Sequence, residues 1–245
     1  MLRDIVYSFI AKGLKIPKSV EEKFGQFVFK SYLKDLLNKL RINCVIDVGA
    51  NVGAYAEGIR KMGYKGHILS FEPHPHVFAT LEKNSQHDPL WRVYDFALGR
   101  TDSYATLNLN MYSALSSFLV PKVHIPKTVE SCEVKISPLD SVLDEILTLV
   151  PEPRIFLKMD TQGYDMEVVQ GASKTLDKVL CLQSEISMYA NYDNIPSYLD
   201  ALKYYESLGF QLIDLFVANR LPQGIIVESD CLMVRSQMLD VAHNK

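Results

Sequence analysis

The alternation of strand-like and helix-like segments after residue 42 is the feature that most constrains the fold of this chain. Short runs rich in β-branched and aromatic residues alternate with stretches whose apolar residues recur at helical spacing. The expected strands are 42–48, 66–72, 91–98, 154–160, 179–186, 210–217 and 224–234, and the expected helices lie near 53–62, 75–85, 164–176 and 195–208. This order is typical of βαβ units, so the sequence predicts an α/β fold with seven strands in a parallel sheet.

Two segments with apolar residues at helical spacing, near residues 2–10 and 20–40, precede the first strand. The 245 residues, of which 48% are hydrophobic, can bury the core of one ordinary domain with little left for a second. We therefore predict an N-terminal helical extension over residues 1–41 and a single domain over residues 42–245. Three roles stay open for the extension: packing on its own domain, forming a homodimer, or making a peripheral contact with a membrane.

The first residues of the chain and the pattern of its cysteines indicate the cellular compartment of the protein. No apolar run approaches the roughly 20 residues of a transmembrane helix, and Arg3 and Asp4 interrupt the stretch where a secretory signal would have its apolar core. The four cysteines are far apart and form no C-x-x-C pair, which is typical of free thiols in a reducing compartment. We therefore expect a cytoplasmic protein without a transmembrane segment.

Residues 103–110 and 132–137 differ from the rest because their polar and apolar residues alternate with a period of two. A long polar stretch that contains prolines, residues 111–130, separates them. The pattern predicts an inserted hairpin that carries a long loop. Long irregular segments beside a binding site are often functional, so we expect this loop to form a lid over an acceptor molecule bound at the domain.

The stretch VIDVGANVGAYAEGIRKMG, residues 45–63, reads as a strand, a glycine-containing turn and a helix. In doubly wound sheets this edge binds ligands, since the backbone can approach closely and helix N-termini offer free N–H groups. The turn reads GANVGA, which lacks two glycines of the dinucleotide fingerprint G-x-G-x-x-G. Asp47 would also repel a pyrophosphate, whereas it suits the cationic sulfonium and ammonium groups of S-adenosylmethionine.

Two more acids follow at the ends of the next two strands. Glu72 stands nineteen positions after Gly53, about the spacing at which an acid accepts hydrogen bonds from ribose hydroxyls. Asp95 precedes Ala97 and Leu98, where an adenine could lie against apolar groups. Each acid alone could cap a turn or lie in solvent. Acids at three successive strand ends favour a nucleoside ligand.

Six segments in a fixed order carry a resemblance to a known family. They are VIDVGANVGAY, LSFEPHPHVFATLEKN, FALG, LDSVL, FLKMDTQGYDMEVVQGA and LQSEISMY. Over roughly residues 42–234 the chain resembles the FkbM-type family of S-adenosylmethionine-dependent methyltransferases. The resemblance implies a Rossmann-like methyltransferase sheet, mostly parallel with an antiparallel last strand, and mostly O-methylation of hydroxyls on sugars and natural products.

The resemblance also implies roles for individual residues. Contact with the methionine half of the cofactor falls to Asp47, Gly49, Asn51 and Gly53. Glu72 would bind the ribose, and Asp95 would meet the edge of the adenine. The chain departs from the family at Gln162 and Asp165, where glutamates are frequent, and at Asp95, where asparagine is frequent.

Methyl transfer to a hydroxyl needs an aligned acceptor and a base that removes the hydroxyl proton. Asp160 and Glu185 end the fourth and fifth expected strands, at the same edge as the cofactor turn. We expect either residue to act as the base or to orient the acceptor, and we leave open whether a divalent metal ion takes part. As alternatives, Asp160 caps the following helix and Glu185 forms an ion pair with a lysine.

The net charge and the sequence motifs limit the class of molecule that accepts the methyl group. The formal net charge is −3 and no basic stripe is visible, which disfavours nucleic acid. The segment KMDTQG also lacks the N-P-P-Y type of motif of base methylation. We therefore expect a small-molecule or glycan acceptor. A nucleic-acid methyltransferase and a non-catalytic cofactor-binding subunit with a regulatory or assembly role remain as alternatives, while Asp47 and the missing glycines disfavour a dehydrogenase.

Overall fold

The structure, a computed structural model, describes residues 18–122, 125–126 and 128–238. The chain divides into two compact units, Met1–Lys39 and Leu40–Lys245. In the first unit, α2 (Lys18–Lys39) is a helix of 22 residues that corresponds to the second expected N-terminal helix. The helix expected near residues 2–10 lies outside the described residues. Within the described residues, no helix combines the length and apolar character that crossing a bilayer requires.

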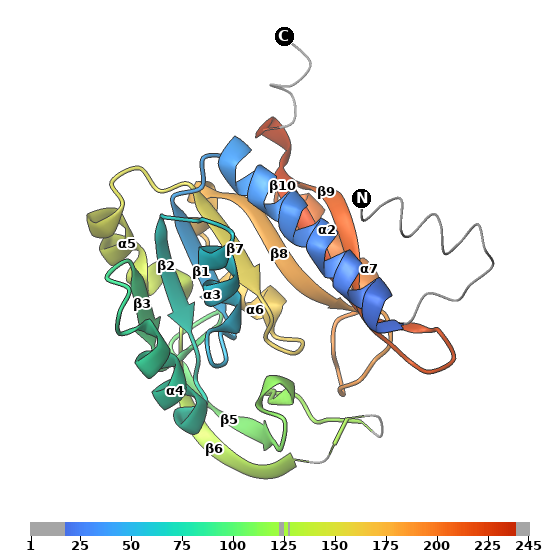
Figure 1. Cartoon of the computed structure of the whole chain (residues 1–245). Helices are drawn as coiled ribbons and strands as arrows, with labels where there is room; N and C mark the ends of the chain where they lie inside the picture. Colours follow the sequence, from blue (N-terminus) through green and yellow to red (C-terminus); the bar gives the residue numbers. More distant parts are fainter. Residues whose placement is uncertain (1–17, 123–124, 127, 239–245) are drawn as a thin grey trace, which may run out of the picture. The chain divides into compact units, whose positions relative to one another are not determined.

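The second unit is built on a seven-stranded sheet with the order β3-β2-β1-β7-β8-β10-β9 (Figure 1). Its strands are β1 (Cys44–Val48), β2 (His67–Phe71), β3 (Trp91–Tyr94), β7 (Ile155–Met159), β8 (Val179–Ser187), β9 (Phe210–Arg220) and β10 (Ile226–Arg235). Neighbouring strands from β3 to β8 are parallel, and β10 runs antiparallel to both β8 and β9. The predicted fold class is confirmed, including the antiparallel last strand.

The central strands are buried on both faces, which explains their continuous apolar runs. Every residue of β1 and of β7 is buried. The chain runs from β1 outward through β2 to β3 and later returns to place β7 on the other side of β1. The strand order therefore reverses between β1 and β7. In open α/β sheets, ligands bind in the crevice outside the carboxyl ends of the strands at such a point.

The helices agree with the sequence in part. They are α3 (Ala54–Lys61), α4 (Pro75–Ser85), α5 (Leu143–Leu149), α6 (Asp165–Gln170) and α7 (Tyr198–Ser207), with short 3-10 turns η2 (Leu139–Val142), η3 (Thr175–Lys178) and η4 (Ser236–Met238). The expected helix over 164–176 is wrong in its second half. It stops before Gly171, where a Cβ would lie 1.9 Å from the Gly99 carbonyl oxygen. The contact with Gly99 therefore fixes this helix end.

A second, three-stranded sheet has the order β4-β6-β5 and contains the predicted hairpin. Its strands are β4 (Ala97–Leu98), β5 (Ser103–Asn110) and β6 (Thr128–Ser137), and a 3-10 turn, η1 (Ser113–Leu115), lies between β5 and β6. β5 and β6 pair antiparallel, as predicted. The expected strand over 91–98 is wrong in its second half, because Ala97 and Leu98 leave β3 and pair with β6. Of the loop 111–130, residues 123, 124 and 127 lie outside the described residues.

Gly53 and Gly58 provide a matched test of how the glycine turn is built. Gly53 has a φ of +89°, and a Cβ there would lie 2.6 Å from the Trp91 ring, whereas a Cβ on Gly58 would meet nothing within 4 Å. We expect Gly53→Ala to lower the free energy of unfolding by about 1–3 kcal/mol, and Gly58→Ala in α3 to raise it by about 0.5–1 kcal/mol. Urea denaturation measures both. Equal midpoints for the two variants would contradict this account of the turn.

Candidate functional site

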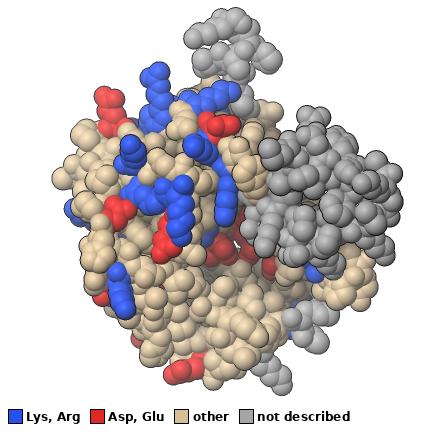
Figure 2. Space-filling view, viewed as in Figure 1, with Lys and Arg blue, Asp and Glu red and all other residues tan. Residues whose placement is uncertain are grey.

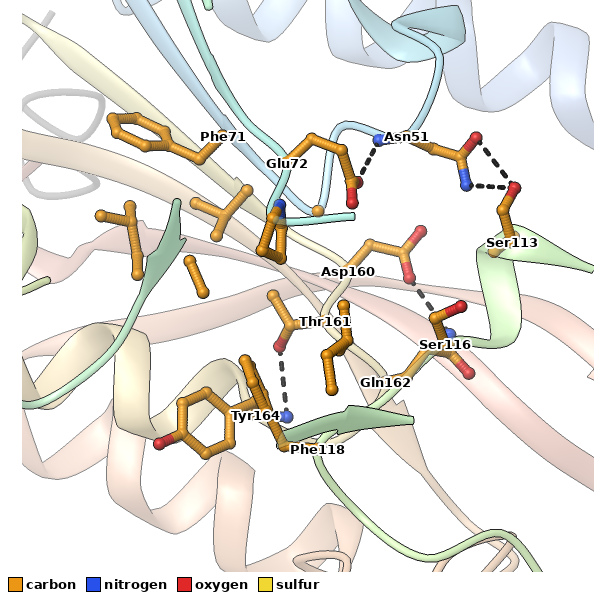
Figure 3. Close-up of a pocket in the computed structure, with 17 residues that line it drawn as sticks. Asn51, Phe71, Glu72, Ser113, Ser116, Phe118, Asp160, Thr161, Gln162 and Tyr164 are labelled. Carbon is orange, nitrogen blue, oxygen red and sulfur yellow. Dashed lines mark hydrogen bonds between the residues drawn. The ribbon is translucent and has the colours of Figure 1, made fainter. Parts of the chain in front are cut away.

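A pocket opens at the carboxyl ends of β1, β2 and β7, where the strand order reverses (Figure 3). Its empty volume, including the open mouth, is about 650 Å³. We call it the strand-end pocket. Its walls come from the glycine turn after β1, the end of β2, the segment after β3, the inserted segment after β5 and the segment after β7.

The first wall depends on a close approach of two backbones. Gly49 has a φ of +72°, and a Cβ on it would lie 2.0 Å from the Asp160 carbonyl oxygen. The Asp160 amide donates to the Val48 carbonyl at 3.1 Å, which holds the two strand ends together. Only glycine fits here, so this glycine sets the shape of the wall. Gly49 also lines the strand-end pocket.

The Glu72 carboxylate forms the polar end of the strand-end pocket. Its Oε2 accepts a hydrogen bond from the backbone N–H of Asn51 at 2.8 Å, and its Oε1 accepts one from the backbone N–H of His74 at 2.9 Å. Burial raises the pKa of Glu72, while these two hydrogen bonds oppose that rise. Both oxygens keep a lone pair, so the carboxylate can still accept hydrogen bonds from a pair of ligand hydroxyls. Figure 3 shows Glu72 directed at the Asn51 amide.

Another wall of the strand-end pocket is apolar. Leu98 and Leu107 line it together with Phe118 and Tyr164. The rings of Phe118 and Tyr164 have centroids 4.7 Å apart and are tilted by 51°. Aromatic and aliphatic walls of this kind suit a flat heterocycle, because ring faces pack on one another or on aliphatic groups. This apolar wall lines the same pocket as the Glu72 carboxylate.

The inserted segment between β5 and β6 covers one side of the strand-end pocket. The Asn51 side-chain amide donates to the Ser113 hydroxyl at 3.0 Å, which joins the glycine turn to η1 (Figure 3). Ser113, Ser116 and Phe118 line the pocket. The segment is tied to the sheet as well, because the Ser117 hydroxyl donates to the Gln162 carbonyl at 2.8 Å. The described part of the expected lid thus belongs to the wall of this pocket.

Four of the eight residues predicted for the site line the strand-end pocket, and four do not. Gly49, Asn51, Glu72 and Asp160 line it, while Asp47, Gly53, Asp95 and Glu185 lie outside its wall. Gly53 is buried and faces Trp91, which explains the glycine without a ligand. Asp95 is exposed to solvent, because the chain turns away after β3 and delivers Ala97 and Leu98 to the pocket instead.

Asp47 is enclosed in the sheet and is not presented to the strand-end pocket. Its carboxylate is fully buried, with Lys158 Nζ 3.1 Å from Oδ1 and the Ser70 hydroxyl donating to Oδ2 at 3.4 Å. Burial alone would lower the pKa of Lys158, but attraction to Asp47 and to Asp160 outweighs it and raises that pKa. Lys158 also lies 5.0 Å from the centre of the Tyr55 ring. Asp47 and Lys158 therefore form a buried ion pair, and Asp47 is next in sequence to Val48, which lines the pocket.

The two candidate bases are joined by one side chain. Gln162 Nε2 donates to Asp160 Oδ1 at 3.2 Å and to Glu185 Oε2 at 2.6 Å. The Asp160 side chain is 42% exposed, whereas Glu185 is half-buried. Burial raises the pKa of Glu185 well above its usual range, and nearby acids, Asp160 first among them, raise it further. Sequence reasoning noted Gln162 only as a departure from the family and did not predict this contact.

The structure also tests the alternatives for these acids. The N-cap of α6, Tyr164, makes no side-chain cap hydrogen bond, and Asp165 in α6 binds the preceding turn, since its Oδ1 accepts hydrogen bonds from the amide and the hydroxyl of Thr161. Lys158 lies 3.8 Å from Asp160, and within the described parts of the chain Glu185 makes no ion pair with a lysine. In the same described ranges, no three His, Cys, Asp or Glu side chains are grouped as a metal ion would need. The described residues thus offer no ready set of metal ligands.

On the face shown in Figure 2, the Lys and Arg side chains of the described residues have Asp and Glu side chains among them. An uninterrupted row of cations would be the footprint of a polyanion. This view of the described residues shows no such row. The observation agrees with the negative net charge of the whole chain.

Comparison with known proteins identifies the family. Residues 47–212 match the family model of the methyltransferase FkbM domain. The chain belongs to the FkbM methyltransferase domain family. The match begins at the end of β1 and reaches into β9, so it includes every strand end that forms the strand-end pocket.

Two relatives and one solved structure illustrate the likeness. The chain is 26% identical over 157 residues to the hexuronic acid methyltransferase AglP of Haloferax volcanii. The matched residues cover 64% of this chain and 61% of that protein. It is 26% identical over 147 residues to Methyltransferase 1 of Beauveria bassiana, with 52% and 57% covered. The chain thus spans about three fifths of the length of these relatives. The structure of a magnesium protoporphyrin IX methyltransferase from Synechocystis, with 9% identity and 91% and 86% of the chains covered, superposes with a TM-score of 0.48.

The acids beside Gln162 predict an unusual pH dependence of stability. Burial raises the pKa of Asp230, which pairs with Glu185 across β10 and β8, to about 6. Folded Asp230 then keeps its proton while the unfolded group, with a pKa near 4, has lost it, so unfolding becomes easier as the pH rises from about 4 to about 6. We expect Asp230→Asn to gain about 2 kcal/mol relative to wild type between pH 4 and pH 7, as measured by urea denaturation.

Asp140 is the control of opposite sign. Although burial acts to raise its pKa, hydrogen bonds from Lys174, Thr175 and Ser173 lower it overall. Its stabilising effect is present above its unfolded pKa and disappears as the pH falls through its folded pKa. Asp140→Asn should therefore lose stability relative to wild type as the pH rises from 3 to 7. The same trend for both variants would contradict the assigned directions.

Proposed function

We propose that the protein is an S-adenosylmethionine-dependent methyltransferase that methylates a hydroxyl group of a sugar or a small natural product. The observation that carries the proposal is the Glu72 carboxylate at the end of β2, fixed by two backbone amides and open to the strand-end pocket beside an apolar wall. This pairing suits the ribose and the adenine of a nucleoside cofactor. Membership of the FkbM methyltransferase domain family supports the same reading.

In this proposal, residues of the strand-end pocket are assigned to each part of the cofactor. Glu72 would accept hydrogen bonds from the ribose hydroxyls, and Leu98, Phe118 and Tyr164 would enclose the adenine. The backbone around Gly49 and Asn51 would meet the methionine half. When bound, the cofactor supplies a methyl group activated by the positive sulfonium. Asp47 would act on the sulfonium charge only from outside the pocket wall, since Lys158 already neutralises the Asp47 carboxylate.

Asp160 is the better placed of the two candidate bases. It lines the strand-end pocket and its side chain is 42% exposed, so an acceptor hydroxyl can reach its carboxylate. Glu185 lies behind Gln162 and does not line that pocket. In this proposal Asp160 accepts the proton of the hydroxyl, while Glu185 supports it through the shared amide. Such a base contributes about 10²–10⁴-fold to the rate of a proton transfer.

The sugar acceptor rests on the likeness to a hexuronic acid methyltransferase at 26% identity. A carboxylate on the acceptor would meet the exposed Asp160 and be repelled unless it points away. Acceptor screens should therefore pair each hexuronate with its neutral hexose. The ratio of their rates would show on which side of the hydroxyl the carboxylate lies.

Calorimetric titration with S-adenosylhomocysteine tests the cofactor part of the proposal. We expect micromolar affinity, about −8 kcal/mol, for wild type, and loss of binding in Glu72→Ala because the ribose hydroxyls lose their acceptor. Glu82→Ala, which removes an exposed glutamate of α4, is the matched control and should bind like wild type. Absence of binding by folded wild-type protein would rule out the proposed cofactor.

Turnover of the screened acceptors tests the base. With methyl glycosides of glucose and glucuronic acid as first acceptors, we expect Asp160→Asn to keep its affinity for S-adenosylhomocysteine but to lose about 10²–10⁴-fold in kcat. Asp95→Asn, an exposed acid outside the strand-end pocket, should change neither quantity. An Asp160→Asn variant with full turnover would remove Asp160 from the mechanism.

A further inference from the structure

Gln162 has a backbone conformation that is costly for a residue with a side chain. Its φ is +51°, in the left-handed region that non-glycine residues rarely adopt. Such conformations persist only where the surroundings hold them, and they cluster at functional sites. The Ser117 hydroxyl donates to its carbonyl at 2.8 Å, and the Tyr192 hydroxyl donates to its Oε1 at 2.9 Å. Two hydroxyls from distant segments therefore hold this one residue.

The orientation of the Gln162 amide follows from its neighbours. The NH₂ group faces Asp160 and Glu185, whose ionised carboxylates accept hydrogen bonds, and the amide oxygen faces the Tyr192 hydroxyl. The Nε2 atom has two hydrogens and two acid partners. Gln162 is buried and lines the strand-end pocket beside Asp160 (Figure 3).

We propose that Gln162 is a positioning residue: its amide holds the carboxyl groups of Asp160 and Glu185 as one hydrogen-bonded unit at the strand-end pocket and so determines how that unit holds a proton. This inference rests on the proposed methyltransferase function for its catalytic meaning. The proton that Asp160 accepts from the acceptor hydroxyl stays on the carboxyl unit until solvent removes it. Gln162 itself neither gains nor loses a proton.

The surroundings explain why a neutral donor is useful at this position. The acids that face Glu185 are Asp160 at the end of β7, Asp165 in α6, and Glu228 and Asp230 in β10. Among the described residues near these acids, the cation is Lys158, which lies 3.8 Å from Asp160 and is shared with Asp47. A neutral amide donor stabilises ionised carboxylates by hydrogen bonds. Unlike a lysine or an arginine at the same position, it would not also attract an acidic ligand into the pocket. A glutamate at position 162 would instead add another negative charge to an acidic group.

Carbon NMR of the Glu185 carboxyl tests this inference without an acceptor. Protein labelled with ¹³C at the glutamate carboxyl is titrated, and Glu185→Gln assigns the resonance. In Gln162→Met the ionised form of Glu185 loses its hydrogen-bond donor, so we expect the titration midpoint to rise by about one pH unit or more. Gln162→Glu should raise it as well. A midpoint in Gln162→Met equal to that of wild type would overturn the proposal.

Two tyrosine variants keep the test decisive if the Gln162 variants fold poorly. Tyr192 and Tyr205 are both fully buried, and the Tyr205 hydroxyl lies 2.9 Å from the Ser184 hydroxyl and makes no recorded contact with Gln162. Tyr192→Phe frees the Gln162 amide and should raise the Glu185 midpoint more than Tyr205→Phe does. Equal shifts, or a larger shift in Tyr205→Phe, would count against positioning by Gln162.

Cofactor binding separates this inference from the proposed function. Wild type is titrated with S-adenosylhomocysteine beside the NMR experiment, because this binding tests Glu72 and the apolar wall rather than the carboxyl unit. If wild type fails to bind, the proposed function falls while the titration still reports on the carboxyl unit. If wild type binds and the Glu185 midpoint ignores Gln162, the function stands and the positioning role falls.

Discussion

The close approach of β1 and β7 at Gly49 and Asp160 is the constraint on which the site depends. The Asp160 amide binds the Val48 carbonyl, and the space where a Cβ of Gly49 would lie is filled by the Asp160 carbonyl. This contact brings together two segments that are more than one hundred residues apart in the chain. It sets the distance between the glycine turn, which forms one wall of the strand-end pocket, and the carboxylate that we assign as base.

The buried ion pair beneath this contact explains both a strength and a failure of sequence reasoning. Asp47 and Lys158 are cross-strand partners in the parallel register of β1 and β7, so their side chains meet on one face of the sheet. Removing one member of such a buried pair costs about 3–5 kcal/mol, since the other charge stays unpaired. The acid at position 47 is evident from the sequence, but its partner Lys158 cannot be read from local sequence. Its charge is therefore neutralised before a ligand meets it.

The sequence was sufficient where local pattern decides structure and insufficient where distant contacts do. All seven main strands overlap the runs that predicted them, and burial on both faces requires such runs in the fully buried strands β1 and β7. Ala97 and Leu98 continue the apolar pattern of β3, yet they pair with β6. The short helix α5 was not among the expected helices, since its seven residues span too few turns for a clear periodicity. Gly171 ends α6 through its contact with Gly99, which no periodicity reveals.

The same distinction applies to the site. Glu72 was predicted from its spacing after the glycine turn, which is a property of one βαβ unit. The inserted segment was predicted as a lid, but Phe118 and Ser113 were not singled out within it, because its path depends on tertiary contacts.

The inserted segment links the two halves of the site. At one end, Ser113 holds the Asn51 side chain, and the Asn51 amide in turn holds Glu72. A few residues later, Ser117 holds the backbone of Gln162, whose side chain holds Asp160 and Glu185. A displacement of this segment would therefore disturb the Glu72 end and the acid end of the strand-end pocket together, because the same segment holds residues at both ends.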